Sequence, residues 1–68
     1  MTDTARRLIA VLKRIGFVEH HQKGSHLFLI RGHVLVCVPV HPGDLAPGTF
    51  HRILKTAGLS PDEYRKLR

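Results

Sequence analysis

Residues 17–38, FVEHHQKGSHLFLIRGHVLVCV, decide the fold because they contain three short strand patterns separated by two tight turns. We expect strands at 17–22, from 25 or 26 to 30, and at 33–38, the last being rich in β-branched residues. Lys23-Gly24 and Arg31-Gly32 are the expected turns, since glycine tolerates the backbone conformations that tight hairpins require. Two consecutive hairpins predict an antiparallel, three-stranded meander.

The pairing of these strands follows from the turns. Two-residue loops at Lys23-Gly24 and Arg31-Gly32 define one register for each hairpin. The expected pairs are Ile30 with His33, Phe28 with Leu35, His26 with Cys37, His21 with His26, and Glu19 with Phe28. Directly opposite residues share a face of the sheet, and a slip by one residue would invert both faces.

The two faces of the predicted sheet differ in composition. One face is wholly apolar and is the expected core face; it carries Leu27, Leu29, Val34, Val36 and Val38. The other face carries His26, Phe28, Ile30, His33, Leu35 and Cys37. Because imidazoles are mixed with apolar side chains there, we expect this second face to be open to solvent or to a partner. Its apolar residues also favour self-association.

Three helices are expected around the sheet. Apolar residues recur at helical spacing in the first and second, which we place at about 3–15 and 47–57, with glycine after each end. Thr2 or Asp3 is the expected cap of the first. A capping box at Ser60 to Glu63 starts a third helix at about 61. The order α-β-β-β-α, with a short extra C-terminal helix, predicts a two-layer α+β domain with helices on one face of the three-stranded sheet.

Length and charge narrow the class of protein. The 68 residues suffice for one small domain, which we place over 1–68. Lys and Arg number 11 against 5 acidic residues, and a net charge of +6 favours nucleic acid, an anionic surface or an acidic protein partner. Cys37 is the single cysteine, which excludes an internal disulfide and fits a reducing compartment. No signal peptide or membrane-spanning run is visible, so we expect a cytoplasmic protein with no membrane partner.

The histidines are the clearest candidates for acid–base catalysis. A histidine that titrates near neutral pH can take the proton of a ribose 2′-hydroxyl, a second group must protonate the leaving oxygen, and a cation must stabilise charge on the phosphorus. Lys23, His26 and His21 can fill these roles close together. A Gly-x-Ser-x-Gly elbow and a helical histidine metal motif are both lacking, so we expect no nucleophilic triad, no metal and no small-molecule cofactor.

Four motifs resemble one protein family in their order and spacing. They are Leu8 to Phe17, Lys23-Gly24-Ser25-His26, Val38-Pro39-Val40-His41, and Pro47-Gly48-Thr49-Phe50 through to Leu59. Over nearly its whole length the chain resembles the HicA-type toxins of bacterial type II toxin–antitoxin systems. These are small mRNA interferases with a fold like that of double-stranded-RNA-binding domains.

The resemblance implies a metal-independent ribonuclease that cleaves mRNA and is blocked by a HicB-type antitoxin. It implies His26 as the catalytic histidine, and Gly24 and Ser25 as the turn that presents it. We expect Lys23 and Ser25 to contact RNA phosphate, and Phe28 to stack on a base.

The sequence leaves open the identity of the second acid–base group and two alternative functions. His21 is the first candidate for a second acid–base group, with Glu19, His33 and His41 behind it. A non-catalytic module that recognises double-stranded RNA by shape would use the same fold and charge without needing a reactive histidine. A protein-interaction domain would instead use the apolar residues of the open face.

Overall fold

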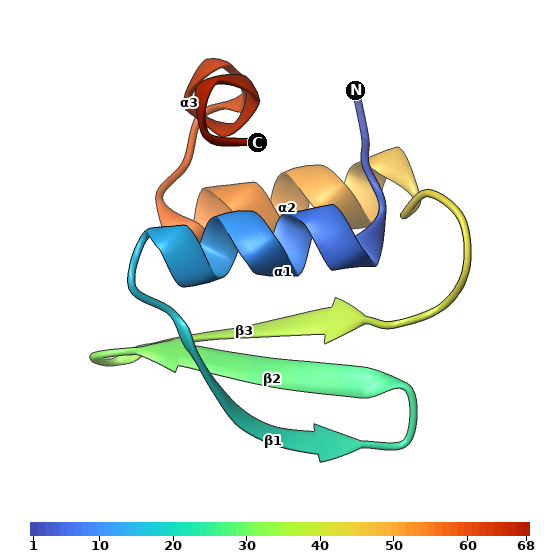
Figure 1. Cartoon of the computed structure of the whole chain (residues 1–68), viewed down its shortest axis with the longest axis vertical. Helices are drawn as coiled ribbons and strands as arrows, with labels where there is room; N and C mark the ends of the chain where they lie inside the picture. Colours follow the sequence, from blue (N-terminus) through green and yellow to red (C-terminus); the bar gives the residue numbers. More distant parts are fainter.

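The computed structural model describes all 68 residues and confirms the predicted α+β architecture. The elements are α1 (Ala5–Arg14), β1 (Val18–Lys23), β2 (His26–Arg31), β3 (Val34–Pro39), α2 (Pro47–Ala57) and α3 (Pro61–Leu67) (Figure 1). Only α2 has both expected bounds. α1 begins later than expected because Thr4, and not Thr2 or Asp3, is its N-cap. The Thr4 hydroxyl accepts a hydrogen bond from the backbone N–H of Arg7 at 3.3 Å.

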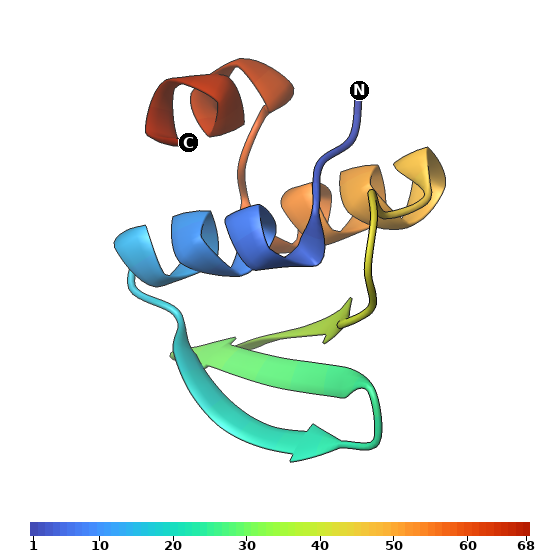
Figure 2. The same cartoon turned by 45° about the vertical axis from the view of Figure 1, so that its right-hand side comes forward.

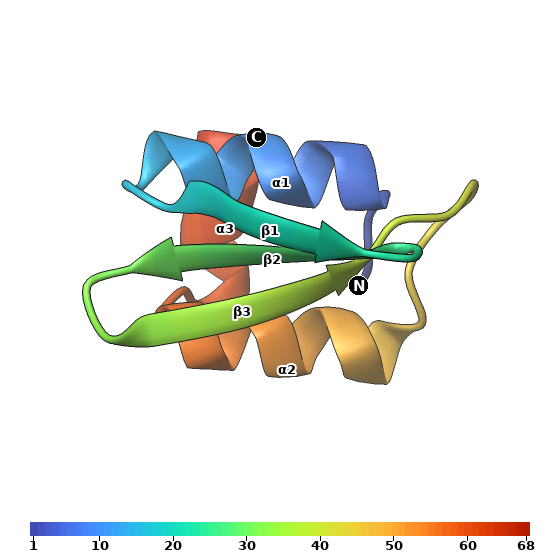
Figure 3. The same ribbon diagram turned by 90° about the horizontal axis from the view of Figure 1, so that it is seen from below.

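The helices form a layer on one face of the sheet, whose strand order is β1-β2-β3. α1 and α2 cover this face, and the opposite face is uncovered (Figure 3). α3, the short extra helix, lies on the same side of the sheet but beyond the α1–α2 pair (Figures 1 and 2). The reason is that its one buried residue, Tyr64, packs edge-on against Phe50 of α2, with ring centroids 4.9 Å apart. None of the three helices is both long and apolar enough to span a membrane.

The core lies between the sheet and the α1–α2 layer. The expected core face is confirmed: Leu27, Leu29, Val36 and Val38 are buried, and Val34 is half-buried against them. Burying each such side chain contributes roughly 1.5–3 kcal/mol, so packing on the sheet, more than helix propensity, holds α1 and α2 in place.

The predicted register of both hairpins is wrong by two residues. The turns are Gly24-Ser25 and Gly32-His33, so the flanking pairs are Lys23 with His26 and Arg31 with Val34. Each glycine takes the first central position, with φ of 59° and 60°, and no non-glycine residue has a positive φ. This is the pattern of a type II′ turn, which matches strand twist and needs a positive φ only at that position. Because the side-chain period is two, a two-residue shift leaves the faces of β2 and β3 unchanged.

A β-bulge changes the pairing along β1. The register shifts between Glu19 and His21, so that His21 pairs with Phe28 and Glu19 pairs with Leu29. The predicted pairs His21–His26 and Glu19–Phe28 are therefore wrong. Glu19 lies opposite a core residue and reaches the helix layer, where its carboxylate binds the Lys13 ammonium at 2.5 Å. The bulge thus removes Glu19 from the open face.

Candidate functional site

The Gly24-Ser25 turn places His26 at the first position of β2, where its side chain is exposed. Two residues lie directly opposite His26: Lys23 across the first hairpin and Pro39 across the second. Directly opposite side chains share a face, so the Lys23 ammonium is the nearest charge that the strand pairing brings to the His26 imidazole. A proline fits this place because a non-hydrogen-bonded position needs no N–H.

Three rows of side chains cross the open face, which Figure 3 views directly. The first row is Lys23, His26 and Pro39; the second is His21, Phe28 and Cys37; the third is Val18, Ile30 and Leu35. The face therefore changes from cationic and imidazole-bearing at the Gly24-Ser25 end to apolar at the Gly32-His33 end. Val18 and Leu35 in the third row are 60% and 48% exposed.

His21 lies in the second row and not beside His26 in the first. Its ring stacks on Phe28 with centroids 4.5 Å apart and planes 8° from parallel. Its Nδ1 lies 2.6 Å from Nδ1 of His20, so one of these two imidazoles donates to the other. His21 is thus a diagonal neighbour of His26, at roughly 7–8 Å between Cα atoms by sheet geometry. Phe28 is half-buried, and His21 covers one side of its ring.

A backbone hydrogen bond ties the His26 turn to the loop after β3. The N–H of Val40 donates to the Ser25 carbonyl at 2.6 Å. The same loop, together with one side of α1, borders a hollow of about 720 Å³ whose lining includes Arg6, Lys13 and His41. This contact brings His41 to the His26 end of the sheet. His33, in contrast, occupies the turn at the opposite end of β2.

Several cations are engaged in holding the fold together. Lys13 pairs with Glu19, and both Arg7 and Arg68 lie near the Asp3 carboxylate. The Arg31 guanidinium donates to the carbonyl oxygens of Ile15 and Ala57 at 2.8 and 3.2 Å. The cations without an ion pair or side-chain hydrogen bond are Arg6, Arg14, Lys23, Arg52, Lys55 and Lys66. Of these, Lys23 and Arg6 lie at the His26 end, on the β1–β2 hairpin and in the hollow.

The sequence identified His26, Lys23 and His41 as site candidates but missed that Arg6 lies in the same region. No local signal could reveal it, because Arg6 is brought there by the packing of α1 against a loop more than thirty residues away. No group of three or more His, Cys, Asp or Glu side chains is arranged to hold a metal ion.

One comparison with known proteins gives a match. A family model described as the HicA toxin of bacterial toxin–antitoxin systems matches residues 5–59. The matched region runs from the first residue of α1 to just beyond α2 and includes the whole sheet, whereas α3 lies outside it. A search of curated proteins finds no match.

Proposed function

The chain belongs to the HicA toxin family of bacterial toxin–antitoxin systems, and from this premise we propose that it is a ribonuclease that cleaves mRNA with His26 as its catalytic histidine. A toxin of this kind has an antitoxin partner, which we propose to be a HicB-type protein that blocks cleavage in the cytoplasm. The observation that carries the proposal is the exposed His26 imidazole on the open face, directly opposite the unpaired Lys23.

The proposed reaction uses the RNA's own 2′-hydroxyl. His26 takes the proton of this hydroxyl, the oxygen attacks the adjacent phosphorus, and the bond to the 5′-oxygen of the next nucleotide breaks. A second group returns a proton to that leaving oxygen, so protons balance without a metal. The Lys23 ammonium stabilises the added negative charge on the phosphoryl oxygens, and the Ser25 turn approaches the backbone closely enough to contact phosphate.

Two histidines are supported as the second group. His21 is diagonal to His26 on the same face, although its ring is held by Phe28 and His20. His41 belongs to the loop whose Val40 is bonded to Ser25. The hollow beside this loop, with Arg6 at its wall, offers a path for RNA phosphates leaving the His26 end. We propose that the half-buried Phe28 ring stacks on a base from the side that His21 does not cover.

The experiment compares His26→Ala with His33→Ala on purified RNA in the presence of EDTA. Both histidines are exposed, but His26 directly follows the Gly24-Ser25 turn, whereas His33 is part of the Gly32-His33 turn at the opposite end of β2. We expect His26→Ala to reduce cleavage by about 10²–10⁴-fold and to abolish growth arrest, while His33→Ala behaves like the parent.

The outcomes separate the competing functions. If His26→Ala cleaves RNA at the parental rate, His26 is not the catalytic residue. If the parent protein retards RNA on a gel without cutting it, the chain is a binding module. A comparison of His21→Ala with His41→Ala then identifies the proton donor as the variant that loses rate on an ordinary substrate but not on one with an activated leaving group.

A further inference from the structure

The two edges of the sheet differ in how open they are to a further strand. The β1 edge is interrupted by the bulge between Glu19 and His21, and its residues are exposed on both faces. Bulges and charged side chains protect an edge from pairing. β3, by contrast, pairs with β2 in unbroken register from Val34 to Pro39. The β3 edge is therefore the one on which another strand can be added.

The β3 edge presents unpaired backbone groups at regular intervals. Next to a two-residue turn, Val34, Val36 and Val38 direct their N–H and C=O groups toward β2, so Leu35 and Cys37 direct theirs outward. No hydrogen bond outside the strand ladder uses the backbone of Leu35 or Cys37. These two amides repeat at about 6.8 Å, the two-residue spacing of an extended chain.

Figure 3 shows α2 lying alongside β3. A groove lies between these two elements. Its volume is about 260 Å³, and its lining is Leu35, Val36, Cys37, Arg52, Ile53 and Thr56. A free strand edge beside a helix is the arrangement in which extended peptides bind by strand addition. The backbone of the edge supplies hydrogen bonds, and alternate side chains of the peptide enter the groove.

The positive charge beside the groove favours an acidic binding partner. The Arg52 guanidinium has no hydrogen bond or ion pair, its exposed neighbours on α2 are His51 and Lys55, and α2 contains no acidic residue. A second copy would bring the same cations together in two chains that each carry +6, which is unfavourable. An acidic segment would instead neutralise Arg52.

We propose that the β3 edge and the groove beside α2 bind an extended, acidic segment of the antitoxin partner, which adds to the sheet as a fourth strand. The proposal rests on the family's antitoxin partner but not on RNA cleavage by His26. The added strand buries Leu35 and places carboxylates opposite Arg52.

Amide hydrogen exchange followed by NMR tests this strand addition with purified cognate antitoxin. In the free protein, we expect the Leu35 and Cys37 amides to exchange rapidly and the Val36 and Val38 amides to be protected. In the complex, we expect Leu35 and Cys37 to become protected by about tenfold or more. Unchanged exchange at these two amides in a saturated complex overturns the proposal.

Charge reversal tests the acidic character of the segment. We expect Arg52→Glu to weaken antitoxin binding by about tenfold or more, because the reversed charge faces the partner's carboxylates. The matched control is Arg14→Glu, which makes the same charge change at an unpaired arginine on α1. Equal losses of affinity in both variants mean that only net charge matters and refute the site.

Three further measurements distinguish the other ways in which this prediction could fail. Protection of Leu35 and Cys37 that increases with protein concentration, without antitoxin, would identify a second copy as the occupant and refute an acidic segment. His26→Ala is expected to bind antitoxin like the parent, so a wrong catalytic assignment leaves this test intact. Protected Val36 and Val38 amides in each variant show that the sheet has folded.

Discussion

Arg31 shows how one residue of a basic protein can be structural. It lies at the end of β2, and its guanidinium donates to carbonyl oxygens at the C-terminal ends of both α1 and α2. It also lies 4.7 Å from the centroid of the Phe17 ring. A cation is favoured there because the carbonyl ends of helices carry partial negative charge. Arg31 thus joins the two covering helices to the sheet and is not among the cations left without a partner.

Replacing Arg31 by Ala is expected to lower the free energy of unfolding by about 1–2 kcal/mol, since two charge-assisted hydrogen bonds and the contact with Phe17 are lost. Urea denaturation measures the change. Arg14→Ala removes an exposed arginine without a partner and should stay within about 0.5 kcal/mol of the parent. Similar losses for the two variants would show that Arg31 does not connect the helices to the sheet.

At the scale of elements, the two hairpins are governed by the position of their glycines. Gly24 and Gly32 both occupy the one turn position with positive φ, and a Cβ added at either would meet no atom within 4 Å. Glycine is therefore required at these positions by the backbone conformation and not by a lack of space for a side chain. The consequence reaches the candidate site, because the Gly24 turn determines that Lys23, and not His21, lies opposite His26.

Two glycine-to-alanine substitutions should therefore have effects of opposite sign. Gly32→Ala is expected to cost about 1–2 kcal/mol of stability, because alanine is strained at positive φ. Gly48 lies in the first turn of α2 with open space around it and no positive φ. Gly48→Ala should therefore raise stability by about 0.5–1 kcal/mol. Thermal denaturation of both variants checks the signs, and a destabilised Gly48→Ala would contradict this account of α2.

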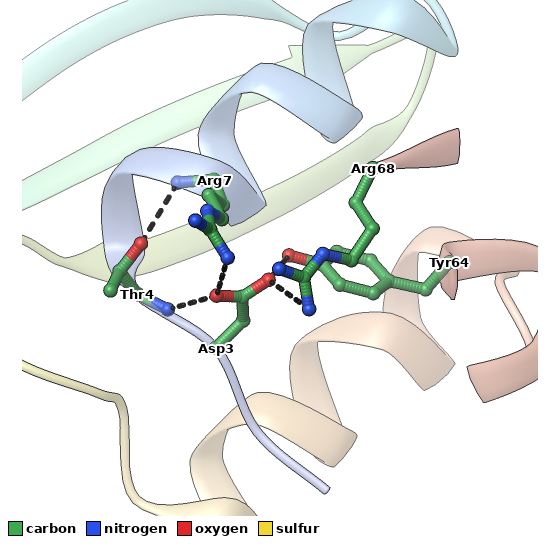
Figure 4. A network of polar contacts seen from close by, with 5 residues as sticks. All are labelled: Asp3, Thr4, Arg7, Tyr64 and Arg68. Atoms are coloured by element: carbon green, nitrogen blue, oxygen red, sulfur yellow. Dashed lines mark hydrogen bonds and ion pairs between the residues drawn. The ribbon is translucent and has the colours of Figure 1, made fainter. Parts of the chain in front are cut away.

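At the scale of the whole molecule, the two ends of the chain are joined by one buried carboxylate (Figure 4). Asp3 is 4% exposed, accepts a hydrogen bond from the Tyr64 hydroxyl at 2.9 Å and another from the Thr4 N–H at 2.8 Å. Arg7 and Arg68 complete its surroundings at 3.8 and 3.5 Å. A buried charge is tolerated only when paired in this way, so Asp3 fixes α3 against the N-terminal segment and α1.

Because of this network, the free energy of unfolding falls at alkaline pH. Burial, and then the hydrogen bond to Asp3, raises the pKa of Tyr64 well above its usual range. An unfolded tyrosine ionises near pH 10, whereas the folded one stays neutral to higher pH. The contribution of Tyr64 is therefore fully present below about pH 10 and is lost as the pH rises beyond it.

Tyr64→Phe is expected to be less stable than the parent by about 1–2 kcal/mol at neutral pH, because Asp3 loses a donor. The difference should stay constant up to about pH 10 and narrow between about pH 10 and about pH 12, since only the parent can lose stability through this hydroxyl. Urea denaturation of both proteins across this range measures it; a constant difference would show that Tyr64 does not titrate with unfolding. Lysine titration affects both proteins alike and cancels in the comparison.

The sequence by itself determined the elements and the faces of the sheet. Helical spacing, the Ser60 capping box and strand alternation are local or periodic signals, so α2 and the core face of β2 and β3 could be predicted. On β2 and β3 the faces were predicted correctly despite the wrong register, because a shift by two residues preserves the alternation. His26 could also be placed on the open face for this reason.

Only the tertiary structure decided which groups surround His26 and how the edges differ. The bulge in β1 moved Glu19 to the helix side and set His21 on Phe28. The Val40–Ser25 hydrogen bond and the Tyr64–Asp3 contact each join residues far apart in the chain. No periodic sequence pattern predicts such contacts, because they depend on how the helices and strands pack against one another. The same holds for the groove beside β3, which exists only once α2 lies along the edge of the sheet.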